Sequence, residues 1–226
     1  MTAPPRAVIP SRWPGRRYLF RIGRFAAPSY AAMLYAGCVL GGTAGARIAH
    51  RSGIEPLRFA LAAALLLIPA LVGGRLWYVL QHPERFAGDP ARVWRTQEGG
   101  AGLYGGLLLS FAVSRPVLAA VQRAFWTFWD AAAVMMLAGM TVTRFGCLIN
   151  GCCAGRETDG PLGVYLPDQA DQAGRWLRRY PVQLPEAGWS ALILAGELAA
   201  RPHLPAPGAL FLSAAAVAAL AARWRS

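Results

Sequence analysis

The chain has 226 residues, of which 55% are hydrophobic and only 15% are charged. Soluble proteins carry about 25% charged residues, so this composition argues against a disordered or collagen-like chain. Four cysteines are too few for a secreted disulfide scaffold. The formal net charge is +12, and the sequence contains arginine but no lysine. A chain that is basic and this apolar indicates anionic membrane lipids as partners rather than nucleic acid.

The chain opens with a basic segment, residues 1–24, which contains six arginines and four prolines. This segment lacks the apolar core and the cleavage site of a secretory signal. We therefore expect a basic interfacial N-terminal arm over residues 1–24, followed by a transmembrane domain over residues 25–226.

Six apolar segments follow the arm. A membrane-spanning helix needs about 20 mostly apolar residues, and the segments that approach this requirement are residues 25–46, 59–80, 99–114, 124–143, 187–200 and 202–222. The fifth is marginal because it is short and contains Glu197. Because the segments are apolar on all faces, they predict an all-α polytopic membrane protein with about six transmembrane helices around a polar lipid-binding cavity. In the first segment, Gly37, Gly41 and Gly45 share one face, which predicts close helix packing.

Two long polar connections separate these segments, at residues 81–98 and 151–186. With six helices, both connections fall on the same side of the membrane. Loops of this length are usually functional or disordered. The second loop follows directly on the densest polar motif of the chain, so we expect the chemistry on this side.

That motif runs from residue 143 to residue 167, where Arg144 ends an apolar helix and Asn150, several glycines and Arg156 follow. Polar groups at this depth are costly unless they face a cavity or bind a ligand. Glycines allow an anion to approach backbone N–H groups, and guanidinium groups bind phosphate with two parallel hydrogen bonds. The pattern favours a phosphate site, and a plain helix end with arginines reaching the interface is the alternative.

Three further clusters lie near predicted helix ends. Residues 98–109 bring glycine-rich backbone into the third helix, and residues 179–188 open the fifth helix with Gln183 and Glu186. Residues 73–86 place Arg75 inside the second helix. An unpaired arginine at the membrane centre costs about 2.5–3.5 kcal/mol, so Arg75 requires a partner or a wet cavity.

The cysteines at 147, 152 and 153 raise the question of a metal site. Zinc sites usually combine one close pair of ligands with a second pair elsewhere, and the three histidines are scattered along the chain. We therefore expect neither a metal nor another cofactor. A membrane thiol oxidoreductase using Cys152 and Cys153 is a lesser alternative, because thiols near Arg144 and Arg156 would have a lowered pKa. Buried, unreactive thiols are the simpler interpretation.

Together the four clusters resemble, in order and spacing, the prolipoprotein diacylglyceryl transferase family. Residues 144–156 are similar to the family signature R-x-G-N-x-x-N-G-x-x-x-G-R. The segment around Arg75 resembles G-A-R-L-G-Y-V, residues 98–107 resemble E-G-G-M-S-F-H-G-G-L, and residues 180–186 resemble H-P-S-Q-L-Y-E. The resemblance covers most of the chain.

This resemblance implies a multi-pass enzyme of the bacterial cytoplasmic (inner) membrane. Its family transfers the diacylglyceryl group of phosphatidylglycerol to the lipobox cysteine of a prolipoprotein, which forms a thioether and releases glycerol phosphate. The resemblance places the headgroup phosphate against the signature, at Arg144, Cys147, Asn150, Gly151, Gly155 and Arg156. It assigns the rest of the polar cavity to Tyr30, Arg75 and Gln183. The catalytic residues that it implies are Arg144, Tyr104 and Glu186.

The chain departs from the family pattern at two of these positions. Tyr104 stands where the family has a functional histidine, and a neutral phenol is a poorer base than an imidazole. Cys147 stands where the family has an asparagine, which removes an amide donor and acceptor. The family pattern also continues into a further helix, so we expect a C-terminally shortened member. These differences leave open a catalytically altered relative that binds phospholipid or handles lipoproteins.

Overall fold

A computed structural model describes residues 18–22, 25–95, 100–121, 124–167, 176–203 and 206–223. Within these residues lie six α-helices, which correspond to the six predicted apolar segments. They are α1 (Ser29–Arg51), α2 (Pro56–Gln81), α3 (Leu103–Val121), α4 (Phe125–Asn150), α5 (Gln183–Ala200) and α6 (Ala209–Arg223). Short 3-10 turns cover Pro83–Arg85, Pro90–Trp94 and Arg201–His203.

The helices agree with the expected all-α membrane protein, and two short antiparallel sheets accompany them. Strand β1 (Tyr18–Ile22) pairs with β2 (Phe25–Pro28), and β3 (Val164–Pro167) pairs with β4 (Trp176–Arg179). Pairing with β1 takes residues 25–28 out of the predicted first helix, which therefore begins at Ser29. The second sheet gives the predicted 151–186 loop a structured part.

Four helices, α1 to α4, are long and apolar enough to cross a membrane. Helix α2 presents a large exposed apolar surface that includes Leu61, Ile68, Leu71 and Leu80. An exposed apolar surface of this kind is typical of a membrane or protein contact. Together with the helix lengths, it indicates a membrane protein.

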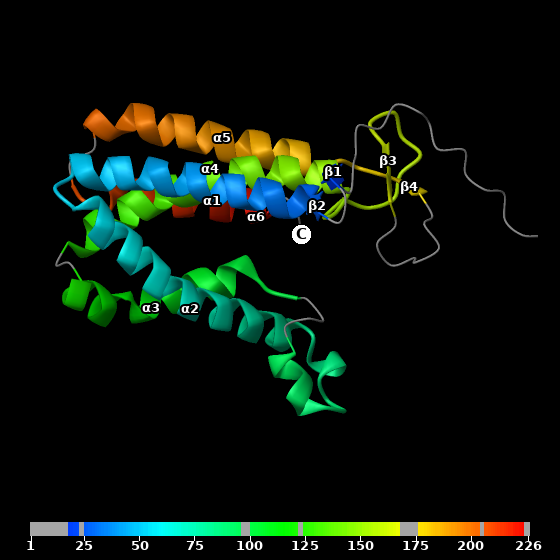
Figure 1. Cartoon of the computed structure of the whole chain (residues 1–226), viewed down its shortest axis with the longest axis horizontal. Helices are drawn as coiled ribbons and strands as arrows, with labels where there is room; N and C mark the ends of the chain where they lie inside the picture. Colours follow the sequence, from blue (N-terminus) through cyan, green and yellow to red (C-terminus); the bar gives the residue numbers. More distant parts are fainter. Residues whose placement is uncertain are drawn as a thin grey trace, which may run out of the picture. The chain divides into compact units, whose positions relative to one another are not determined.

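The chain divides into two compact units, each with its own packing. The first contains the described residues within 1–45, 133–205 and 212–226. In it, α1 and α4 pack so closely that a Cβ on Gly37 would lie 2.8 Å from the Gly139 carbonyl oxygen. Helix α5 contacts α6 through a hydrogen bond of 2.8 Å, which Ser213 Oγ donates to Glu197 Oε1. The predicted close packing of the first helix is thus confirmed at Gly37. Figure 1 shows α1 running beside α4.

The second unit contains the described residues within 46–132 and 206–211. Its centre is a cluster of aromatic rings, namely Phe59, Phe111, Phe125, Phe128, Trp129 and Phe211. Beside the cluster, the Asp130 carboxylate accepts hydrogen bonds from the backbone N–H groups of Gly208 (2.7 Å) and Phe211 (3.0 Å). An acidic side chain at this place caps the N-terminus of α6 and complements its dipole.

Candidate functional site

The candidate site of the first unit is built on the C-terminal end of α4. The Gly151 N–H donates to the Leu148 carbonyl (3.1 Å), and the Cys152 N–H donates to the Cys147 carbonyl (3.0 Å). Gly151 has φ +76°, so these two bonds form a Schellman motif. This motif commonly brings together the side chains at the two ends of its longer bond, which here are Cys147 and Cys152.

Three thiols converge at this helix end. The Sγ atoms of Cys147, Cys152 and Cys153 all lie within 4.8 Å of one another. Cys147 and Cys152 are buried, whereas Cys153 is exposed and has φ +61°. Hydrogen bonds from Cys147 and Cys153 lower the pKa of the Cys152 thiol. The cluster therefore favours one thiolate, held by its two neighbours.

Two amide side chains support the turn that carries these thiols. Gln183, at the start of α5, is fully buried and donates from Nε2 to the Cys152 carbonyl at 2.7 Å. Its Oε1 is buried and has no hydrogen-bond partner within the described residues. Asn150 forms a side-chain hydrogen bond to Cys152. The structure thus brings Gln183, Asn150 and Cys147 into one cluster.

Arg144 lies on α4 beside this cluster. Its Nε is 3.0 Å from Glu186 Oε2 on α5, and the two side chains are 26% and 18% exposed. Glu186 is the one carboxylate paired with Arg144 in the described part of the chain. Tyr30, in the first turn of α1, interacts electrostatically with Arg144 and with all three thiols. Partial exposure and a single ion pair leave part of this guanidinium open to an anionic ligand.

Arg156 and Gly155 belong to the loop between α4 and β3. The exposed Arg156 guanidinium lies 5.7 Å from the centre of the Tyr180 ring. The Gly155 N–H donates to the Tyr180 carbonyl at 2.9 Å, and a Cβ on Gly155 would lie 2.7 Å from Val182 Cγ1. The Gly151 N–H likewise donates to a backbone carbonyl, that of Leu148 at the end of α4. In this structure both predicted phosphate-binding glycines therefore donate to backbone carbonyls. The positive φ of Gly151 and the close approach of Val182 to Gly155 account for glycine at these two positions.

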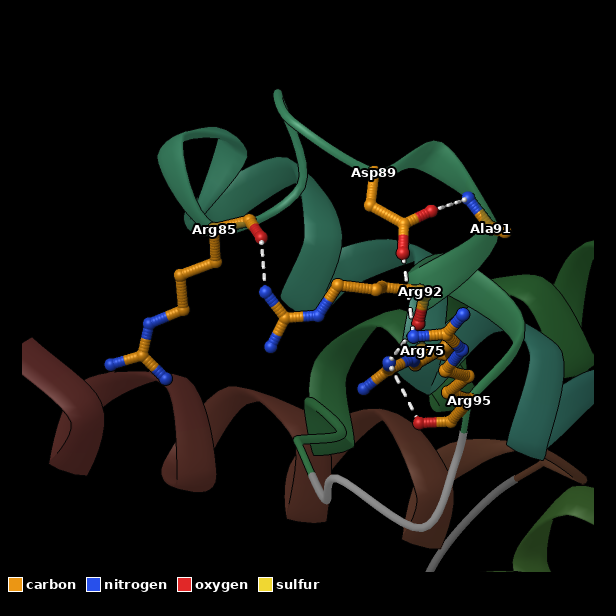
Figure 2. A network of polar contacts seen from close by, with 6 residues as sticks. All are labelled: Arg75, Arg85, Asp89, Ala91, Arg92 and Arg95. Atoms are coloured by element: carbon orange, nitrogen blue, oxygen red, sulfur yellow. Dashed lines mark hydrogen bonds and ion pairs between the residues drawn. The ribbon is translucent and has the colours of Figure 1, made fainter.

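Arg75 belongs to the second unit, where α2 packs against the loop that follows it. Arg75 is 7% exposed, and its guanidinium donates to four backbone carbonyls, as Figure 2 shows for two of them. These are the carbonyls of Val93 (2.8 Å from Nε), Gly100 (3.1 Å from Nη1), Arg92 (2.8 Å from Nη2) and Arg95 (3.2 Å from Nη2). The predicted partner of this arginine is thus its own loop. With these donors engaged, Arg75 holds the loop rather than presenting its charge to a ligand.

Other charged side chains of the same loop also stabilise it. Asp89 accepts from the Ala91 N–H at 3.1 Å and pairs with Arg95 at 3.3 Å, and Arg92 donates to the Arg85 carbonyl at 3.3 Å (Figure 2). Tyr104, also in the second unit, stands in the first turn of α3 and is 44% exposed. Glu98, which belongs to the same predicted cluster, lies outside the described residues.

The geometry supports anion chemistry at the α4–α5 junction. A guanidinium fixed by one carboxylate stabilises negative charge on a phosphate ester as it leaves. The same guanidinium lies near the thiols at this helix end. An acidic partner, Glu186, is also placed where it could accept a proton.

Comparison with known proteins points the same way. The sequence pattern of the prolipoprotein diacylglyceryl transferase family matches residues 17–223. The phosphatidylglycerol–prolipoprotein diacylglyceryl transferase of Pasteurella multocida is 36% identical over 125 residues, which are 54% of this chain and 44% of that protein. The corresponding enzyme of Bordetella bronchiseptica is 33% identical over 57% of this chain and 48% of its own length.

A third relative is matched over a longer stretch. The enzyme of the same name from Synechococcus elongatus is 26% identical over 177 residues, or 77% of this chain and 61% of that protein. The chain spans about half the length of the first two relatives. Since the family pattern extends over nearly all of the sequence, the chain belongs to the prolipoprotein diacylglyceryl transferase family.

Proposed function

We propose that this chain transfers the diacylglyceryl group of phosphatidylglycerol to the lipobox cysteine of a prolipoprotein. The observation that carries the proposal is the Arg144–Glu186 pair at 3.0 Å, partly exposed at the end of an apolar helix. Arg144 lies in the segment that resembles the family signature, and Glu186 lies in the segment that resembles H-P-S-Q-L-Y-E. The names of the relatives support the same reaction and the same two substrates.

The reaction is a displacement at carbon. The thiol sulfur attacks the glyceryl carbon that carries the phosphate, and a C–S bond forms as the C–O bond breaks. The bonding electrons leave with the phosphate as glycerol phosphate, and the thiol proton passes to a base. Arg144 stabilises the departing phosphate, with Arg156 as a second cation. Glu186 or Tyr104 orients or deprotonates the thiol, directly or through water.

The remaining predicted site residues position these groups. Gln183 and Asn150 hold the turn after α4, where Cys147, Gly151 and Gly155 shape the backbone. Tyr30, on α1, interacts electrostatically with Arg144 and with the thiols. Arg75 keeps the polar loop after α2 in place. We propose that the enzyme sits in the bacterial cytoplasmic membrane as a multi-pass protein, with α5 and α6 also spanning and with a polar cavity for the lipid headgroup.

The test is a transfer assay with purified protein, phosphatidylglycerol and a lipobox peptide. Mass spectrometry of the peptide detects the added diacylglyceryl group. We expect the Arg144→Ala variant to lose at least about one hundredfold in rate, which is the effect of removing one donor to a developing anion. The control variant is Arg58→Ala, which removes an exposed arginine paired with Glu55 on the surface of α2. Wild-type protein that binds phosphatidylglycerol but forms no thioether would refute the transferase and leave a lipid-binding relative, which Tyr104 in place of histidine would then explain.

A further inference from the structure

The proposed transfer assigns no role to Cys152 or Cys153, and the sequence offered no second ligand pair for a metal. The structure nevertheless gathers three sulfur ligands at the end of α4. We propose that Cys147, Cys152 and Cys153 together bind one thiophilic metal ion, with Zn²⁺ as the expected ion and a fourth position left open.

The spacing of the thiols fits such an ion. With Zn–S bonds of about 2.3 Å, tetrahedral ligands lie about 3.8 Å apart. The three Sγ atoms lie within 4.8 Å of one another, so small side-chain rotations close the remaining gap. In the described part of the chain, no histidine, cysteine or carboxylate joins the group as a fourth ligand. Three protein ligands and an open position are typical of zinc sites that exchange a ligand.

The backbone shows that the third thiol is not a by-product of packing. The Schellman motif alone accounts for contact between Cys147 and Cys152, but it requires nothing of the residue that follows. Cys153 is nevertheless the one non-glycine residue with positive φ in the described part of the chain. This conformation is strained for a residue other than glycine, and such strain concentrates at ligand sites.

Gln183 gives an independent indication of a ligand at this place. Its Nε2 holds the Cys152 carbonyl, while its fully buried Oε1 has no partner within the described residues. Buried acceptors almost always have a donor. A metal-bound water in the open position would provide one, in the way that polar groups around metal sites commonly support the ligands.

The charges around the three thiols and their access to solvent are also compatible with a bound metal ion. Three thiolates and one Zn²⁺ carry a net charge of −1, and the guanidinium of Arg144 lies near the cluster with a compensating positive charge. Cys153 is exposed, which provides an entry path to the two buried sulfurs. A disulfide between Cys147 and Cys152 is the competing fate of these thiols. It would use two of them and leave the strained third without a role.

The test is a metal titration of the full chain in detergent, purified under reducing conditions and stripped of metal. Co²⁺ is the probe, because thiolate ligands give it a charge-transfer absorption, and Zn²⁺ should displace it. We expect one ion per chain and at least a tenfold weaker affinity for the Cys153→Ser variant, whose exposed side chain can change without disturbing the core. The Cys38→Ser variant, which alters the exposed cysteine of α1, should bind like the wild type.

Three results would overturn the proposal. The first is the absence of thiolate-to-cobalt absorption, and the second is equal affinity in the wild type and Cys153→Ser. The third is a Cys147–Cys152 disulfide, found by peptide mapping, in protein isolated without oxidant. The titration uses no phosphatidylglycerol and no peptide, so its failure would leave the proposed transfer intact, and failure of the transfer assay would leave the metal site intact.

Discussion

The Arg75→Lys variant tests whether Arg75 stabilises the loop after α2 or binds a ligand. The wild-type guanidinium donates to four loop carbonyls at 2.8–3.2 Å while only 7% exposed. Lysine keeps the charge but offers a single nitrogen, so it cannot span the same fork of acceptors. We expect two of the four bonds to be lost. Each hydrogen bond to a charged group contributes about 1.5–3 kcal/mol. The lower value applies because the loop carbonyls regain water when the loop opens, so the loss of two bonds makes the folded loop about 3 kcal/mol less stable.

Hydrogen exchange of residues 82–95 measures this change. A loss of about 3 kcal/mol corresponds to roughly one-hundredfold faster exchange of the loop amides. Arg85→Lys is the matched control in the same loop. Within the described residues, the exposed Arg85 side chain donates one hydrogen bond, to the Tyr78 hydroxyl at 2.6 Å, which lysine can also make. Exchange in the Arg75→Lys variant that equals both the wild type and the control would refute the reasoning.

Substitutions at three other positions have expected outcomes. Asp130→Ala should lower unfolding stability in detergent by about 2 kcal/mol, because the N-terminus of α6 loses its cap, whereas Asp130→Asn should lose less; equal stability of both with the wild type would contradict this. Gly41→Leu should reduce the yield of folded protein, because a Cβ there meets the Met135 carbonyl of α4; normal yield and melting temperature would show looser packing. Glu186→Gln should slow transfer roughly tenfold, about 1.4 kcal/mol, because Arg144 loses its ion pair, and an unchanged rate would exclude Glu186 from positioning it.

The helices could be predicted because the membrane imposes a simple rule on sequence. Long apolar runs have few alternatives to a helix, so all six segments appear as helices within several residues of their expected limits. The errors lie at the ends. The first helix starts late because residues 25–28 pair with β1, and the fifth starts early, at Gln183, although Pro185 interrupts its apolar pattern.

The contacts of single polar residues were harder to predict. Arg75 was expected to need a partner, but backbone carbonyls carry no signal in the sequence, so its loop could not be identified. Asp130 binds backbone groups 78 and 81 residues further along the chain, which only the fold can reveal. In contrast, a glycine at position 151 after a helix predicts the Schellman motif, and that signal could have indicated the contact between Cys147 and Cys152.

The most direct test of the account is chemical rescue at Arg144. In the transfer assay, the Arg144→Ala variant should form thioether at least about one hundredfold more slowly than the wild type. Added guanidinium ion, at concentrations too low to unfold the protein, should restore part of the rate, and ammonium at the same concentration should restore much less because it lacks the planar fork. Undiminished thioether formation by Arg144→Ala without any additive would contradict the claim that this guanidinium stabilises the departing phosphate.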